Sequence, residues 1–120
     1  MPVAARLPAV FQLMALLEAR YAMRILWALR DGHAQTFRLL QDSVGGATPN
    51  TLNARLKELR AAELVTHGHE GYVITPTGAD LVKRLGELPA FAHKWVASQA
   101  KKNPTLPQSP GDQDARTPAG

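Results

Sequence analysis

Two Thr-Pro pairs, Thr48-Pro49 and Thr75-Pro76, constrain the fold of this chain more than any other local feature. A threonine hydroxyl can accept a hydrogen bond from the first turn of a helix. Proline suits the following position, because the N–H that it lacks has no helical partner there. Each pair therefore predicts the start of a helix, and Thr36 is expected to cap a further, shorter helix. Between the two helices that begin at the Thr-Pro pairs, glycines favour a tight turn at about 68–71 that joins two short strands.

Apolar periodicity and the positions of Gly and Pro predict a mainly helical chain with one small β-hairpin. Helices are expected over residues 8–17, 21–30, 36–44, 48–64, 75–88 and 90–102, and strands over residues 64–69 and 71–76. Pro89 is expected to break or kink the helix before it. A short helix, a long helix and a hairpin in this order form a winged helix-turn-helix, whose long helix fits the major groove of DNA.

The long helix that begins at Thr48 has two different faces. A helical wheel places leucines 52, 56 and 59 on one stripe, and the opposite face carries two asparagines, an alanine and a lysine. Amides suit adenine edges, lysine suits guanine or phosphate, and alanine lets the backbone approach or touches a thymine methyl. Any solvated helix face can carry such residues, but asparagine is a poor helix former, which favours a reading role here. The residues expected to contact DNA are Arg38, Thr48, Asn50, Thr51, Asn53, Ala54, Arg55, Lys57 and Arg60.

The arginines near this helix are expected to contact the DNA backbone. Arg38 lies at the start of the short helix and Arg60 at the flank of the reading face, and both positions suit phosphate contacts. Arg55 lies near the leucine stripe and suits a contact with the hairpin or with phosphate. Arg24 and Arg30 fit a backbone-contacting side and a solvated surface equally well.

The composition limits the other function classes. A length of 120 residues fits one domain, predicted over residues 1–102, and the Pro-rich segment 103–120 is expected to be disordered. The absence of cysteine excludes disulfides and thiol chemistry and is compatible with the cytoplasm, where we expect the protein. The net charge of +4 favours a polyanionic partner. No segment is long and apolar enough to span a membrane, and Pro8 and Gln12 disfavour a signal peptide.

Neither catalysis nor metal binding is supported by the residues present. The sequence offers no nucleophile–base pair, no carboxylate dyad and no phosphate-cradling glycine loop. His67 and His69 share one face of a strand, but no third ligand lies near them in sequence, so hydrogen bonding or a weak phosphate contact fits them better. We therefore predict a protein that is not an enzyme and that has no cofactor and no metal.

Three segments carry a resemblance to a known family. RYAMRILWALRDG, FRLLQDSVGGATPNTLNARLKELRAAELV and YVITPTGADLV resemble HxlR-type bacterial transcription regulators, over about residues 8–88. The most specific match is TPNTLNARLKEL, whereas many winged helices share the pattern of YVITPTG. The resemblance implies a winged helix related in fold to MarR-type regulators, with Asn50, Thr51, Asn53, Ala54 and Lys57 on the recognition helix. It also implies a sequence-specific regulator of transcription that binds operator double-stranded DNA.

The same resemblance implies a two-fold homodimer joined by the first and last helices. The segment 8–17 agrees with this, because a helix without a polar face must be covered on more than one side. The last helix adds two aromatic residues. The residues expected at the dimer interface are Val10, Phe11, Met14, Leu17, Phe91 and Trp95.

The chain departs from the family pattern in three places. Residues 18–21 read Glu-Ala-Arg-Tyr where the family usually has Gly-Gly-Lys-Trp, and the cysteine that some members use to sense oxidants or electrophiles is absent. The hairpin is shorter than usual, contains Glu70 and has no Arg or Lys. This hairpin favours an alternative in which the winged helix joins a protein assembly without reading DNA. A small-molecule effector also stays an open alternative, although no polar cluster marks a pocket for one.

Overall fold

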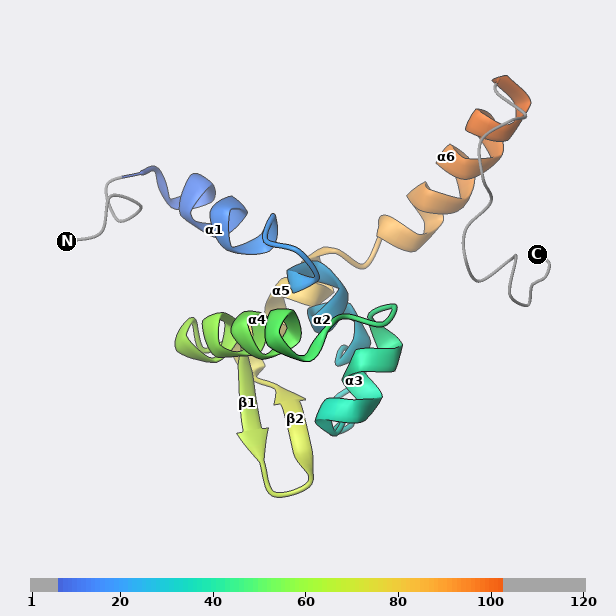
Figure 1. Cartoon of the computed structure of the whole chain (residues 1–120). Coiled ribbons are helices and arrows are strands. Elements are labelled where there is room, and N and C mark those ends of the chain that lie inside the picture. The colour runs from blue at the N-terminus through green and yellow to red at the C-terminus, as the bar shows by residue number, and fades with distance from the viewer. Residues whose placement is uncertain (1–6, 103–120) are drawn as a thin grey trace. The chain divides into compact units, whose positions relative to one another are not determined.

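The computed structural model of the chain describes residues 7–102. In chain order the elements are α1 (Ala9–Leu17), α2 (Ala22–Ala28), α3 (Phe37–Ser43), α4 (Pro49–Ala61), β1 (Val65–Gly68), β2 (Gly71–Ile74), α5 (Pro76–Arg84) and α6 (Leu88–Lys102) (Figure 1). The chain divides into two units, Met1–Arg84 and Leu85–Gly120, so α1 to α5 and the hairpin belong to the first unit and α6 to the second. The predicted class, mainly helical with one hairpin, is confirmed.

Threonine caps begin the three helices α3, α4 and α5, as the sequence predicts. The Oγ1 atoms of Thr36, Thr48 and Thr75 accept hydrogen bonds from the backbone N–H three residues later, at 3.2, 3.4 and 3.0 Å. Each bond satisfies one of the N–H groups that a helix start leaves without an intrahelical partner. Pro49 and Pro76 follow two of these caps in the first helical turn.

The second helix, α2, is shorter at both ends than predicted. Tyr21 precedes it with a φ of 73°, in the left-handed region that non-glycine residues rarely adopt, so the helix begins only at Ala22. The helix ends at Ala28, and Gly32 then takes a φ of 84° as the chain turns away. The sharp connection between α1 and α2 lies beside α4, to which Arg20 is hydrogen-bonded.

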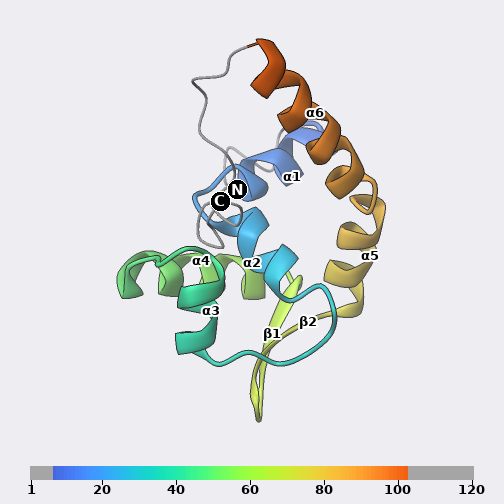
Figure 2. The same ribbon diagram turned by 90° about the vertical axis from the view of Figure 1, so that its right-hand side faces the viewer.

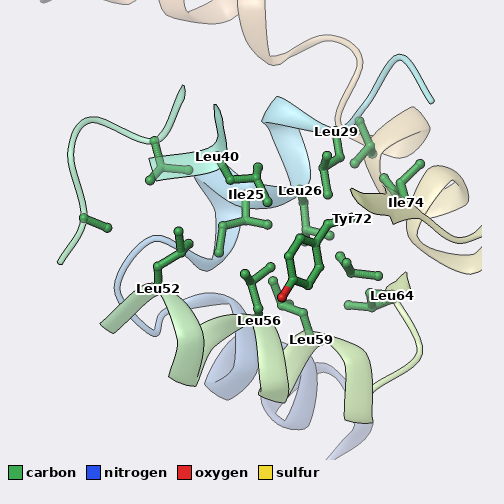
Figure 3. Packing of buried hydrophobic residues seen from close by; sticks show 14 residues of the cluster. Ile25, Leu26, Leu29, Leu40, Leu52, Leu56, Leu59, Leu64, Tyr72 and Ile74 are labelled. Carbon is green, nitrogen blue, oxygen red and sulfur yellow. The ribbon is translucent and has the colours of Figure 1, made fainter. Parts of the chain in front are cut away.

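One hydrophobic core lies around α2 (Figure 3). Figure 2 shows α2 between α4 on one side and α5 on the other. Ile25, Leu26 and Leu29, on α2 and at its end, are at most 1% exposed. They meet the buried residues Leu40, Leu52, Leu56, Leu59, Leu64, Tyr72, Ile74 and Val82 from the surrounding elements. Burial of each large aliphatic side chain contributes roughly 1.5–3 kcal/mol.

The hairpin is anchored to the helices by a third extended segment. β1 and β2 are antiparallel, with Val65 opposite Ile74 and Gly68 opposite Gly71. Gln35, just before α3, forms an isolated bridge with Tyr72 through N–H···O bonds of 3.0 and 2.8 Å. The hairpin therefore has a defined position relative to α3 and α4, unlike a free two-stranded ribbon.

A close backbone contact explains the glycine of the second Thr-Pro motif. A Cβ atom at Gly78 would clash with the carbonyl oxygen of Leu64, so only glycine fits where α5 passes the start of β1. Thr75 also donates from Oγ1 to the carbonyl of Glu63 at 2.6 Å. The Thr-Pro-x-Gly sequence therefore fixes how the second strand turns into α5.

The expectation for the end of α5 was wrong. The apolar pattern predicted that Leu85 and Leu88 continue this helix and that Pro89 breaks it, but α5 ends at Arg84. Pro89 instead occupies the first turn of α6, where its missing N–H has no cost. Within residues 7–102, no helix combines the length and the apolar character that crossing a membrane requires.

Candidate nucleic-acid interface

The α3–turn–α4 segment forms the predicted helix-turn-helix. Gly45 and Gly46 take φ values of 98° and 83°, and the N–H of Gly46 donates to the carbonyl of Gln41 at 2.7 Å. The Gln41 side chain donates from Nε2 to the carbonyl of Ala47 at 2.9 Å. These two bonds tie the end of α3 to the segment that leads to Thr48. They fix the turn between the two helices.

The two faces of α4 separate as the helical wheel predicts. Leu52, Leu56 and Leu59 are at most 1% exposed and hold α4 against the core. The opposite face is at the surface, and its exposed residues are Asn50, Asn53, Ala54, Lys57 and Arg60. The buried stripe thus fixes which side chains α4 presents outward. A two-faced helix of this kind has the geometry that an element entering the major groove requires.

The two threonines at the start of α4 bond to each other. Their hydroxyl oxygens lie 3.0 Å apart, and Thr48 Oγ1 also accepts the capping bond from the N–H of Thr51. Thr48 is exposed and Thr51 is half-buried. The structure therefore gives Thr48 a role in starting the helix, in addition to the DNA contact predicted for it.

Arg55 lies near the leucine stripe, as the helical wheel places it, and its hydrogen-bond partners are Arg20 and Glu58. It does not reach the hairpin, because its Nε atom donates to the backbone carbonyl of Arg20 at 2.8 Å. Its Nη1 atom lies 2.8 Å from Oε1 of Glu58, and the Arg55 side chain is only 16% exposed. We therefore assign Arg55 to holding α4 against the connection between α1 and α2. It is left out of the reading face.

Arg38 and Arg60 are exposed on α3 and on the last turn of α4, respectively. Within residues 7–102 neither forms an ion pair. Their guanidinium groups are therefore available for the phosphate contacts predicted from the sequence. Arg30 differs from these two arginines, because its side chain contacts Trp27. Its Nη1 atom donates to the backbone carbonyl of Trp27 at 2.8 Å, and its guanidinium carbon lies 4.6 Å from the centre of the Trp27 ring.

The hairpin, which is the wing of this fold, carries no basic side chain other than histidine. The His67 ring stacks on the Tyr72 ring, with centroids 4.1 Å apart and planes at 5°. His69 and Glu70 form the turn, and the described residues hold no group of three or more side chains that could bind a metal ion. The stack gives His67 a packing role in the wing.

An arginine cluster that the sequence did not predict lies around Tyr21. The guanidinium carbons of Arg20 and Arg24 lie 4.9 and 5.8 Å from the centre of the Tyr21 ring. Arg24 also donates from Nη1 to the carbonyl of Val44, at the end of α3, at 3.1 Å. The spacing of one aromatic residue between two arginines was the available signal. In the sequence, Arg20 and Tyr21 stand only as a departure from a family motif, and Arg24 fits a backbone-contacting side and a solvated surface equally well.

Apolar side chains lie exposed on both helices predicted to join two subunits. Val10, Phe11 and Met14 of α1 are 52, 52 and 51% exposed, and Phe91 and Trp95 of α6 are 63 and 54% exposed. Leu17 differs, because it is half-buried and packs against the core of its own chain. Each helix, taken by itself, therefore exposes a large apolar surface of the kind that binds protein.

The model of the HxlR-like helix-turn-helix family matches residues 16–100. The chain belongs to this family. A similar solved structure is that of the quinone-bound YodB of B. subtilis, with 27% sequence identity and a TM-score of 0.64 over 73% of this chain and 98% of that one. No match was found among curated proteins. HxlR-like proteins are DNA-binding transcription regulators and not enzymes, and this chain shares their winged helix-turn-helix fold.

Proposed function

We propose that this HxlR-like protein is a homodimeric regulator of transcription that reads operator DNA with α4. The observation that carries the proposal is the separation of α4 into a leucine face that is at most 1% exposed and a polar face that is open to solvent. A groove-reading helix needs its base-contacting side chains free while the rest of the helix is held rigidly.

Each residue of the open face has its own role in the proposal. Asn50 and Asn53 form hydrogen bonds with base edges, because a side-chain amide has both an N–H donor and a carbonyl acceptor. Ala54 lets the helix backbone approach the groove, and Lys57 contacts a guanine or a phosphate. Arg38, Arg60 and Thr48 contact phosphates and set the register of the protein on the duplex.

The dimer supplies a second copy of α4. A helix-turn-helix dimer reads two half-sites separated by about one helical turn of DNA. The exposed apolar side chains of α1 and α6 support this assembly, because five of them are more than half exposed in the single chain. The proposed interface residues are Val10, Phe11, Met14, Phe91 and Trp95.

A small-molecule effector also belongs to the proposal, since the similar YodB structure contains a bound quinone. The present chain has no cysteine. An electrophile therefore has no thiolate to attack here, and an effector of this protein binds without forming a thioether.

Selection of bound sites from random duplex DNA, followed by affinity measurements, tests the reading face. Asn53→Ala is expected to lose about 1–3 kcal/mol of discrimination at one base position. Lys57→Ala, if the lysine neutralises a phosphate, weakens binding to all sequences alike. It reduces the magnitude of the negative slope of log association constant against log salt concentration by about 0.9 for each phosphate that is no longer neutralised. Lys83→Ala on α5 removes the same charge away from α4 and leaves both quantities unchanged.

Two results contradict the proposal in different ways. Unchanged discrimination and salt slope in both α4 variants show that another surface reads the DNA. No binding by the wild-type protein, even at low salt, favours the second candidate, a winged helix that joins a protein assembly. The feature that favours this second candidate is the short wing, which carries Glu70 and no Lys or Arg.

A further inference from the structure

The arginine cluster around Tyr21 is a charged surface to which the proposed reading mechanism assigns no role. Arg20 and Arg24 are both exposed, and their guanidinium carbons lie within 5.8 Å of the centre of the same half-buried ring. Contact with an aromatic face limits the motion of a guanidinium group and leaves its N–H groups able to donate to an anion. The two positive charges are therefore held in place before any ligand arrives.

No carboxylate neutralises these two arginines in the described part of the chain. The ion pairs within residues 7–102 join Arg55 with Glu58, Arg84 with Asp80, and His33 with Asp31. Arg24 uses one N–H in its bond to Val44, and a guanidinium group has five. Both side chains thus keep donors and a full charge for an anionic partner.

The cluster lies beside the reading helix, on the side away from the wing. Figures 1 and 2 both place the α1–α2 connection above α4 and the hairpin below it. The backbone of Arg20 is bonded directly to Arg55 of α4, and Arg24 is bonded to Val44, which precedes α4 by a short turn. The open face of α4 is therefore flanked by two arginines on one side and by a wing without Lys or Arg on the other.

We infer that Arg20 and Arg24, held by Tyr21, form a clamp for the DNA phosphate backbone on the α1–α2 side of α4. This inference rests on the proposed function, since it requires α4 to lie in a groove. A duplex has a sugar–phosphate strand at each side of its major groove, so a helix in that groove has phosphates on both flanks. The clamp supplies positive charge on one flank of α4. The short acidic wing, on the other flank, supplies none.

The salt dependence of DNA binding tests the clamp. Arg20→Gln is the cleanest variant, because the bond from Arg55 uses the backbone carbonyl of residue 20 and survives the change. A dimer of this variant neutralises two phosphates fewer, so the plot of log association constant against log salt concentration becomes less steep, and the magnitude of its negative slope falls by about 1.8. Affinity falls by the same factor on the selected site and on random duplex DNA, because phosphates carry no sequence information.

A second variant and a matched control keep the test independent of folding. Arg24→Gln removes the other charge, and its thermal unfolding is measured because it also lacks the bond to Val44. Arg84→Gln removes an equal charge on α5, on the far side of α2 from α4 in Figure 2, and leaves the slope unchanged. Tyr21→Leu keeps bulk but removes the ring that holds both arginines, and it lowers affinity without removing any charge.

The outcomes separate the clamp from the proposed function. Suppose that Arg20→Gln keeps the wild-type salt slope while the separate Asn53→Ala variant loses base discrimination. This combination overturns the clamp and leaves the reading face intact. A slope that falls as much in Arg84→Gln as in Arg20→Gln also overturns it, because general charge then explains the effect. Failure of the wild-type protein to bind DNA overturns the proposed function itself.

Discussion

The Nε atom of Arg55, in the middle of α4, donates a 2.8 Å hydrogen bond to the backbone carbonyl of Arg20, which lies 35 residues earlier in the chain. The bond joins the predicted reading helix to the connection between α1 and α2. The residue after Arg20, Tyr21, has a φ of 73°, so the carbonyl of Arg20 belongs to a sharply turned segment of backbone. The orientation of α4 therefore depends on a contact far from its DNA-facing surface.

Replacement of Arg55 by methionine is expected to lower the free energy of unfolding by about 1.5–3 kcal/mol, the range for hydrogen bonds to charged groups. Glu58→Gln is the matched control. This variant removes only the ion pair between Glu58 and Arg55. Because the Glu58 side chain is 48% exposed, the loss of stability is at most about 1 kcal/mol. Urea unfolding of both variants measures the difference. Equal losses would show that the bond to the Arg20 carbonyl does not stabilise the fold.

Alanine at position 71 is expected to detach the wing from Gln35. Gly71 has a φ of 135°, and a Cβ atom there would lie 2.5 Å from the carbonyl oxygen of Gln35. The variant should lose roughly 1–3 kcal/mol of stability, the scale of strain at such a backbone position. Gly68→Ala is the control in the same hairpin, because its Cβ would meet the Gly71 carbonyl oxygen at an ordinary 3.6 Å. Amide hydrogen exchange at Tyr72 in both variants distinguishes local detachment from general destabilisation.

Loss of the cap at Thr48 is expected to weaken the start of α4. Thr48→Ala removes the acceptor for the N–H of Thr51 and should cost about 1 kcal/mol in thermal or urea unfolding. Thr48→Ser keeps a hydroxyl group at the same position and should lie within a few tenths of a kcal/mol of the wild-type protein. A serine variant as unstable as the alanine variant would contradict the capping role.

A glutamate on either proposed dimer helix is expected to produce monomers. Phe11→Glu on α1 and Trp95→Glu on α6 each place a charge on an apolar surface that a partner subunit would desolvate. Leu39→Glu on α3 is the matched control, because Leu39 is 53% exposed and lies outside both helices. Sedimentation equilibrium measures the mass of each protein. A monomeric wild-type chain, or a dimer that persists in both α1 and α6 variants, would rule out this interface.

The exposed carboxylate of Asp31 gives a small pH dependence of stability. The backbone N–H of His33 donates to Asp31 Oδ1 at 3.1 Å, and this bond, with the nearby His33 side chain, lowers the pKa of Asp31. A lowered pKa stabilises the folded state above the ordinary pKa of an aspartate, and the contribution disappears as the pH falls through the folded value.

The Asp31→Asn variant is therefore expected to be slightly less stable than the wild-type protein at neutral pH and equally stable at strongly acidic pH. Urea midpoints of both proteins across this range measure the convergence. His33→Ala keeps the backbone N–H, which is the main cause of the shift, and should retain most of the pH dependence. A constant difference between wild type and Asp31→Asn at every pH would contradict this origin.

The confirmed sequence predictions all rest on contacts between residues close in the chain. Thr36, Thr48 and Thr75 cap their helices because a cap needs only an N–H three residues later. The leucine stripe of α4 is buried because helical geometry alone places residues 52, 56 and 59 on one side. Residues on the opposite side are exposed for the same reason.

The end of α5 could not be predicted in this way. Leu85 and Leu88 continue an apolar helical pattern, yet the helix ends at Arg84 and a new one begins at Leu88. The spacing of apolar residues indicates which face of a helix would be buried. It does not indicate whether the backbone stays helical from one residue to the next. A proline close to an apolar pattern fits both the end of one helix and the first turn of the next.

Local chemistry was enough to establish the order of the elements, the helix starts and the outward-facing side chains of α4. The tertiary structure alone decided that Arg55 turns inward to the Arg20 carbonyl and that Gln35 joins the wing. It also decided that Arg20 and Arg24 share the Tyr21 ring. Each of these contacts, apart from the arginine–tyrosine cluster, joins residues far apart in sequence. The cluster is local, but its tyrosine has a left-handed backbone, which apolar periodicity and turn residues did not indicate.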